Sequence, residues 1–170
     1  MRWSMILTVA LAAALVACGP QQLTRQELAV EEQALQRQVQ LWEQSLNSVK
    51  PDSIALVYQR SPAFSAAWPD GKRTRGWDEE EQAQRDFAAR TTAYNFDVQD
   101  PVIEVLSPNV ALTTFGHTTD IADSVSGRAL YSGRGTIVWV KDPTDKVWKI
   151  HTLQVSRTPA PAAQPAGRRR

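Results

Sequence analysis

The fold is decided by residues 129–141 and 147–155, which read ALYSGRGTIVWVK and VWKIHTLQV. Both stretches are rich in Val, Ile, Thr and aromatic residues, which favour β-strands. The residues between them include Asp142-Pro143-Thr144-Asp145, a set typical of turns. Because strands joined by so short a link run antiparallel, the two stretches predict a β-hairpin.

More strands precede this hairpin. Residues 94–98 alternate between apolar and polar side chains, and residues 102–106 and 110–119 have the composition of strands. Turn-forming residues fill the gaps at 107–109 and 123–127. This half of the chain therefore predicts a meander of four or five antiparallel strands.

A long helix is predicted before the strands. Thr24-Arg25-Gln26-Glu27 fits the capping box, in which the Thr and Glu side chains each accept a hydrogen bond from the other residue's backbone amide. An apolar stripe then runs over about six turns, at Leu28, Leu35, Val39, Trp42, Leu46 and Val49. We expect this stripe to pack against the sheet. A coiled-coil dimer is the alternative, because the spacing continues for about three heptads.

Two shorter helices should complete the α part. One begins at Pro51, whose missing N–H costs nothing in a first turn, and ends at Tyr58. The other begins at Asp78, which forms a second capping box with Glu81, and directs Phe87 inward. Helices followed by an antiparallel meander predict the α+β class.

Residues 1–17 have the anatomy of a secretory signal peptide. Arg2 is their only charged residue, and the run from Met5 to Val16 has one polar member. A run of this length is too short to cross the roughly 30 Å hydrocarbon core of a bilayer. It leads into Leu15-Val16-Ala17-Cys18, which resembles the lipobox of bacterial lipoproteins. That resemblance implies that Cys18 becomes the acylated first residue of the mature chain; a signal peptide cleaved elsewhere is the alternative.

The lipoprotein resemblance also implies a location and a partner. Such proteins carry several acyl chains, which anchor a protein stably whereas a single chain does not. Gly19 follows the cysteine, which by resemblance to enterobacterial sorting rules implies the outer membrane, with the domain facing the periplasm. Residues 18–24 would form a short tether, so the membrane is a predicted partner. Residues 158–170, rich in Pro and Ala and ending in three Arg, are expected to be a disordered tail.

Composition excludes several classes of function. Between Cys18 and Ser156 lie 14 of the 19 basic and all 18 acidic residues, a net charge of −4, which argues against nucleic-acid binding. The chain has one Cys and two His, so neither a disulfide framework nor a Cys/His metal cluster is expected. The sequence has no glycine-rich phosphate-binding loop, and we expect neither a metal nor a cofactor.

Several marks in a fixed order resemble one family. They are the long helix with Trp42, the short helix ending at Tyr58, an extended stretch at 61–69 closing on the turn Pro69-Asp70-Gly71, the capped helix with Phe87, and the strand sequences NVALT (109–113), GRGTIVW (133–139) and WKI (148–150). This order resembles the SnoaL-like branch of the nuclear transport factor 2-like superfamily over residues 25–157. The resemblance implies a cone-shaped, strongly curved antiparallel sheet, covered by about three N-terminal helices and enclosing a cavity.

The last strand departs from that family. Many relatives end it with Trp-Lys-Ile-Val-His-x-His-x-Ser, whereas this chain reads WKIHTLQVS from Trp148 to Ser156. The two family histidine positions are Thr152 and Gln154 here. His151 falls one residue early, on the opposite face of an alternating strand, so no family role is transferred to it.

The resemblance and the strand alternation together give a candidate ligand pocket. The face of the last strand that holds Thr152 and Gln154 is the inner face by resemblance, and an inward Arg134 would require an anionic ligand or an internal ion pair. The candidate pocket residues are Tyr58, Trp68, Phe87, Thr113, Phe115, His117, Arg134, Thr136, Thr152 and Gln154.

The sequence leaves three functions open. The first is non-catalytic binding of a small apolar or anionic ligand in the cell envelope. The second is a small-molecule isomerase, dehydratase or cyclase, in which His117 would exchange protons with help from Asp97 or Tyr58. The third is an envelope interaction module that forms a homodimer through the open face of its sheet. Fold resemblance alone does not choose among them.

Overall fold

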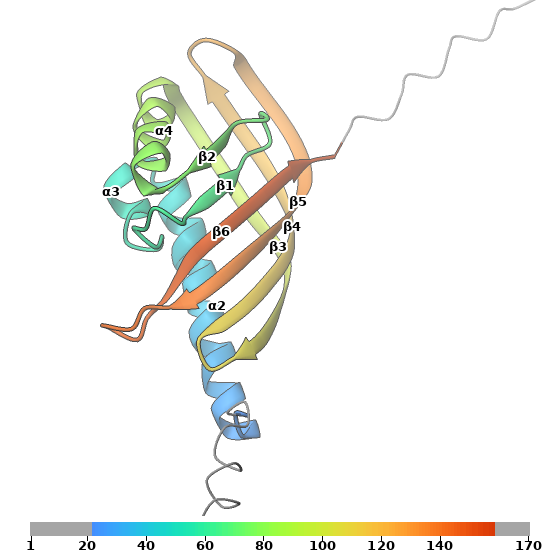
Figure 1. Ribbon diagram of the computed structural model, residues 1–170. Helices are drawn as coiled ribbons and strands as arrows, with labels where there is room; N and C mark the ends of the chain where they lie inside the picture. Colours follow the sequence, from blue (N-terminus) through green and yellow to red (C-terminus); the bar gives the residue numbers. More distant parts are fainter. Residues whose placement is uncertain (1–21, 159–170) are drawn as a thin grey trace, which may run out of the picture.

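The computed structural model describes residues 22–158, so the predictions for residues 1–17, for Cys18 and for the tail beyond Thr158 lie outside the described residues. Within the described range the elements follow one another as α2 (Arg25–Asn47), α3 (Pro51–Ile54), β1 (Ser65–Ala67), β2 (Arg73–Arg75), α4 (Trp77–Arg90), β3 (Thr91–Ser107), β4 (Val110–Asp123), β5 (Gly127–Lys141) and β6 (Trp148–Arg157) (Figure 1). No helix of this part of the chain is both long and apolar enough to span a membrane. The α+β class and the three helices are as predicted.

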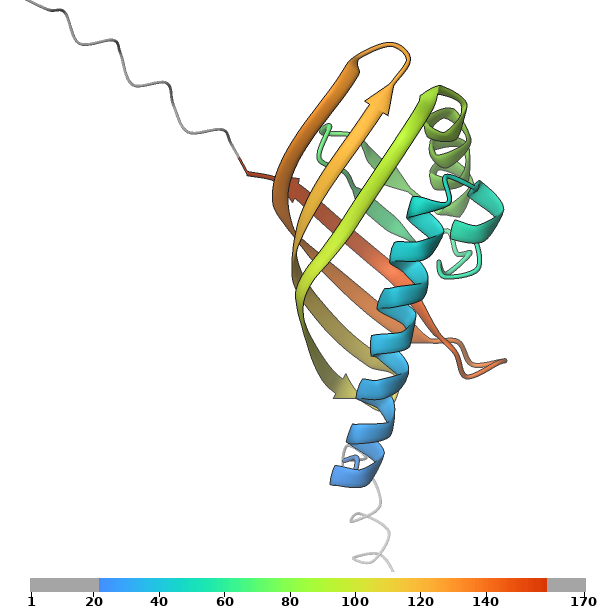
Figure 2. The ribbon, with the colours of Figure 1, turned by 180° about the vertical axis from the view of Figure 1, so that it is seen from behind.

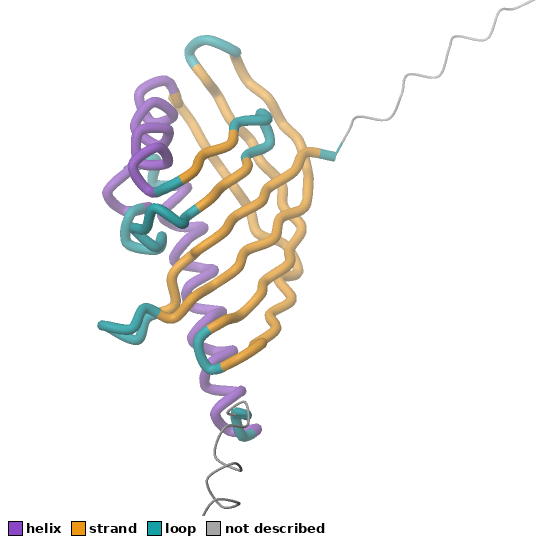
Figure 3. Tube along the Cα trace, viewed as in Figure 1, coloured by secondary structure: helices purple, strands orange, loops and turns teal. Residues whose placement is uncertain are grey.

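One curved sheet holds all six strands, in the order β2-β1-β6-β5-β4-β3. The predicted meander is β3 to β6, and each of its strands pairs antiparallel with the next. The stretch predicted to be extended contains β1, whose parallel pairing with β6 was not predicted. The turns that join β1 to β2 and β4 to β5 lie at one end of the sheet, here called the open end (Figure 3). The start of α2 lies at the other (Figure 1).

Helix α2 begins at the predicted capping box and runs along the concave side of the sheet (Figure 2). The Glu27 amide donates to Thr24 Oγ1 at 3.3 Å, and the Thr24 amide donates to Glu27 Oε2 at 2.8 Å. Most of the predicted apolar stripe is buried, and the ring of Trp42 meets those of Phe96 and Phe115 edge-on, with centroids 5.4 and 5.5 Å apart. The sheet of the same chain covers the stripe, which contradicts the coiled-coil alternative.

The starts and ends of the shorter helices differ from the prediction. Helix α4 begins at Trp77 with Gly76 as its N-cap, so the capping box expected at Asp78 is wrong. Tertiary hydrogen bonds decide the start instead: the Gly76 amide donates to the Phe64 carbonyl at 2.7 Å, and the Trp77 amide donates to the Ser61 carbonyl at 3.0 Å. Helix α3 has a single turn and ends before the predicted limit.

Two glycines of β5 make room for rings of the neighbouring strand. A Cβ atom at Gly135 would lie 2.1 Å from Cζ of Phe115, and one at Gly133 would lie 1.7 Å from the Ser156 carbonyl oxygen and 2.5 Å from Nε2 of His117. Both glycines keep regular register with β4 and β6, and the irregularity of the β5–β6 pair lies at Val138/Trp139. These glycines therefore permit close approach of aromatic rings to the backbone rather than forming a bulge.

We predict that Gly135→Ala lowers the free energy of unfolding by about 1–3 kcal/mol, because the new methyl group would overlap the packed ring of Phe115. Gly116→Ala is the matched control. A Cβ atom added at Gly116 would have no contact nearer than 3.7 Å. We therefore expect the free energy of unfolding of this variant to be unchanged or raised by up to about 1 kcal/mol. Guanidinium unfolding of both variants measures the difference, and equal effects would contradict the close-approach account.

Candidate functional site

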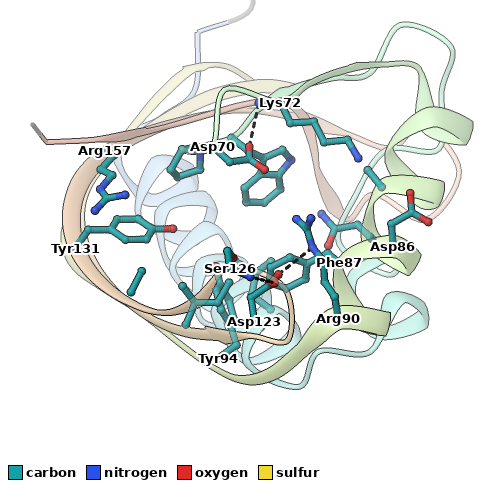
Figure 4. Close-up of a pocket in the computed structure, with 17 residues that line it drawn as sticks. Asp70, Lys72, Asp86, Phe87, Arg90, Tyr94, Asp123, Ser126, Tyr131 and Arg157 are labelled. Carbon is teal, nitrogen blue, oxygen red and sulfur yellow. Dashed lines mark hydrogen bonds and ion pairs between the residues drawn. The ribbon is translucent and has the colours of Figure 1, made fainter.

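A cavity of about 480 Å³ lies at the open end of the sheet, between α4, the β1–β2 turn and the ends of β3 to β6 (Figure 4). Helix α2 ends before it reaches the open end, so this helix does not fill the cavity. Asn47, the last residue of α2, donates through Nδ2 to the Phe96 carbonyl at 2.9 Å and accepts from the Phe96 amide at 2.7 Å. Leu46 is the α2 residue that lines the cavity, and Ala83 of α4 projects only a methyl group toward it.

Aromatic side chains from several elements form the cavity walls. Trp68 follows β1, Phe87 lies on α4, Tyr94 on β3 and Tyr131 on β5. The rings of Phe87 and Tyr94 meet edge-on at 5.1 Å, and the hydroxyl of Tyr131 points into the cavity (Figure 4). Burial raises the pKa of both tyrosines, so each is a neutral phenol able to donate a hydrogen bond at neutral pH.

The buried acid of the cavity is already engaged. Asp123 Oδ1 accepts from the amides of Ser126 and Val125 at 2.9 and 2.8 Å, and Oδ2 lies 3.0 Å from Nε of Arg90. The hydrogen bonds from the Ser126 and Val125 amides lower the pKa of Asp123 most, and the Ser126 side chain and the Arg90 charge lower it further. A carboxylate held ionised with both oxygens engaged is a poor proton acceptor for a ligand.

Charged side chains of both signs surround the opening of the cavity, here called the mouth, and include Asp70, Lys72, Asp86 and Arg157. The guanidinium of Arg157 lies 4.7 Å from the centroid of the Tyr131 ring. Asp70 accepts from the Lys72 amide at 2.9 Å, and Asp86 accepts from Nε2 of Gln82 at 2.8 Å. Within residues 22–158, neither Lys72 nor Arg157 forms an ion pair. No group of three metal-binding side chains occurs in that range either.

His117 does not line the cavity. It is buried against Phe96, with ring centroids 4.8 Å apart and nearly parallel planes. Its Nε2 lies 3.1 Å from the Ser156 carbonyl, which can only accept, so Nε2 carries the proton and Nδ1 accepts from the Thr119 hydroxyl at 3.0 Å. Both nitrogens of neutral His117 are therefore bonded to protein groups.

The proposed partners of His117 lie elsewhere. Asp97 is on the exposed face of β3, where it accepts from Nε2 of Gln99 at 3.0 Å. Tyr58 is buried and its oxygen accepts from Nε1 of Trp42 at 3.1 Å. The predicted catalytic grouping of His117 with Asp97 is therefore wrong, because successive strand residues point to opposite faces of the sheet.

The predicted pocket residues divide into three groups. Trp68 and Phe87 line the cavity. Tyr58, Thr113, Phe115 and His117 lie on the inner side but are buried in the core. Arg134, Thr136, Thr152 and Gln154 were predicted to face inward and do not. The inner residues of β5 and β6 around them are Gly133, Gly135, Ile137, Leu153 and Val155.

A β-bulge explains the error on the last strand. Trp139 pairs with Ile150 but Val138 pairs with Thr152, so His151 is an extra residue. The bulge reverses the alternation, and Leu153 rather than Thr152 continues the inner face. Thr152 instead accepts a hydrogen bond from Oγ of Ser65 on β1 at 3.3 Å.

Sequence reasoning missed Glu80, which is fully buried beside the cavity. Its carboxylate accepts from Nε2 of Gln84 at 2.6 Å, from Nε1 of Trp68 at 3.4 Å and from the Thr74 hydroxyl. Its spacing along the helix is the sequence feature that could have indicated an inward position. Glu80 precedes Phe87 by seven residues, which places both on the same face of α4.

We predict that His117 makes the fold sensitive to acid. Burial lowers the pKa of His117 from 6.5, against the opposing effect of the Ser156 hydrogen bond. The unfolded chain therefore binds a proton more readily, and the free energy of unfolding should fall as pH drops below about 6.5, by at most about 1.4 kcal/mol per pH unit.

His117→Asn should lack this acid-dependent loss, whereas His151→Asn should retain it because His117 is still present. Denaturant unfolding of the parent and both variants from pH 8 to pH 5 measures the effect. A constant difference between parent and His117→Asn across that range would contradict the assignment.

Similarity to solved structures identifies the fold family of this architecture. No family model and no curated protein matches the sequence. Among solved structures, a nuclear transport factor 2-like superfamily protein from Salmonella enterica is 20% identical with a TM-score of 0.70, covering 84% of this chain and 99% of that one. A Novosphingobium aromaticivorans protein described as a candidate scytalone dehydratase is 16% identical with a TM-score of 0.70, covering 86% and 100%. A Caulobacter vibrioides protein with a cystatin-like fold is 17% identical with a TM-score of 0.65, covering 75% and 89%. This chain therefore has the nuclear transport factor 2-like fold.

Proposed function

We propose that the domain binds a small aromatic or otherwise apolar molecule in the cavity at the open end and does not transform it. The observation that carries this proposal is the cavity itself, whose volume of about 480 Å³ falls within the range of small-molecule sites. Trp68, Phe87, Tyr94 and Tyr131 offer flat apolar surfaces. The Tyr131 hydroxyl and the Gln84 amide supply the few polar contacts that orient a ligand.

A dehydratase-type reaction is the second candidate function. It is favoured by the Tyr131 hydroxyl, which points into the cavity beside the Arg157 guanidinium (Figure 4). Such a reaction also needs a proton acceptor near the ligand. His117 and Asp123 are both held by protein hydrogen bonds, so we place binding first.

We further propose that acylated Cys18 anchors the domain to the outer membrane, with the cavity facing the periplasm. The geometry of α2 supports a consistent orientation. Arg25 and Leu46 are separated by about 32 Å along the helix axis, and only Leu46 lies at the cavity. The anchored end of the domain would then lie far from the cavity, which would receive its ligand from the aqueous phase.

Pairing of two copies through the outer sheet face stays a prediction. Exposed apolar side chains on that sheet include Val102 and Leu106 of β3 and Leu130 of β5. Arg134 and Thr136 belong to the same exposed side of β5 as Leu130. A dimer formed there would leave the cavity accessible, so this prediction is compatible with ligand binding.

We expect the parent protein to bind N-phenyl-1-naphthylamine, a neutral aromatic probe whose fluorescence rises in apolar sites. Ala129 lines the cavity, so Ala129→Trp should fill it and weaken binding by at least about tenfold. Leu130→Trp is the matched control, because Leu130 is the next residue and is 75% exposed. Fluorescence titration of the three proteins decides; equal affinities for both variants would place the probe elsewhere.

The anchoring proposal predicts the behaviour of Cys18→Ser. Without the thiol no acyl chain can be attached, and the protein should leave the membrane fraction or remain unprocessed. Gly19→Ala, which retains the cysteine, should fractionate as the parent does. Separation of cells expressing each protein into soluble and membrane fractions provides the measurement. A Cys18→Ser protein that has lost its leader and still stays with membranes like the parent would place the anchor elsewhere.

A further inference from the structure

We infer that Glu80 is a positioning residue for the ligand cavity, an inference that rests on the proposed binding function. Glu80 lies on α4, and its side chain has no exposed surface. Within residues 22–158 its carboxylate has no ion-pair partner. Burying a carboxyl group costs free energy unless hydrogen bonds satisfy its oxygens. The donors that satisfy Glu80 are therefore the groups that it holds in place.

Three donors from three parts of the chain satisfy this carboxylate. Gln84, one turn further along α4, donates to Oε1 at 2.6 Å. Trp68 donates from Nε1 to Oε2 at 3.4 Å, and the hydroxyl of Thr74 on β2 donates to the same oxygen. Glu80 therefore joins α4 to the β1–β2 hairpin through Trp68, which follows β1, and Thr74, which lies on β2.

Two of these three donors line the cavity. Trp68 supplies an aromatic wall and Gln84 a polar group, whereas Glu80 and Thr74 do not line it. Because the indole N–H is tied to Glu80, the flat face of Trp68 is held at a fixed position beside the cavity. The turn that follows Trp68 carries Asp70 and Lys72 to the mouth, and its own backbone hydrogen bonds, from the Gly71 amide to the Trp68 carbonyl and from the Trp68 amide to the Lys72 carbonyl, join it to Trp68.

A purely structural role makes a different prediction. If Glu80 only joined α4 to the hairpin, its loss would lower stability without changing the affinity of the remaining folded protein. If Glu80 positions the cavity wall, its loss changes ligand affinity and the environment of the Trp68 indole at the same time. The two readouts therefore separate the roles.

The test uses Glu80→Met in the full chain, which keeps side-chain length and removes both acceptor oxygens. We expect its affinity for N-phenyl-1-naphthylamine to fall about tenfold, because hydrogen bonds to residue 80 then no longer hold the Trp68 indole and the Gln84 amide beside the cavity. The ¹H–¹⁵N resonance of the Trp68 indole, assigned with Trp68→Phe, should move and exchange faster with water. Glu81→Met is the control on the same helix, since the partner of Glu81 among residues 22–158 is the exposed Arg85.

Glu80→Gln should largely restore both readouts, because its amide oxygen can accept from Trp68 once the Gln84 amide turns over. Thr74→Val serves if Glu80→Met does not fold; it lies outside the cavity yet should shift the same indole resonance and weaken binding. Lower stability with unchanged affinity and an unchanged Trp68 resonance would overturn the inference. If the parent does not bind the probe, the proposed function fails, and the Trp68 resonance alone decides whether Glu80 holds the indole.

Discussion

Two hydrogen bonds between the Asn47 side chain and the backbone of Phe96 join the last residue of α2 to β3. Below this level the helix fills the concave sheet, with Trp42 buried against Phe96 and Phe115. Above it the sheet continues to the open end without a helix inside, and α4 stands at the side (Figure 2). A solid half and a hollow half of one sheet follow from where α2 stops.

In the solid half, a side chain of a type often found in active sites is held by packing and by hydrogen bonds to protein groups. Both ring nitrogens of His117 are hydrogen-bonded, to the Ser156 carbonyl and to the Thr119 hydroxyl. The ring lies so close to β5 that residue 133 has to be a glycine. In the hollow half, Asp123 is likewise held by amides and Arg90. What remains available there is an aromatic surface with a few polar groups, which suits recognition more than proton transfer.

The sequence was sufficient for the order of the three helices and the meander, for the capping box of α2 at Thr24 and for the antiparallel pairing within the meander. It did not predict the short strand β2. It was insufficient for the inner face of β6, because the extra residue His151 reverses the alternation and leaves no local signal. The inner face of β5 did carry a signal: Ile137 and Trp139 are apolar, whereas Arg134 is charged. Glu80 was hidden because its burial depends on donors from the distant β1–β2 hairpin.

The most direct test of the account is a crystal structure of the full chain purified from its natural source. The account predicts a cavity at the open end, with non-protein density between Trp68, Phe87 and Tyr131. A structure in which α4 closes onto β5, so that side chains fill that space and leave no room for a small molecule, would contradict it.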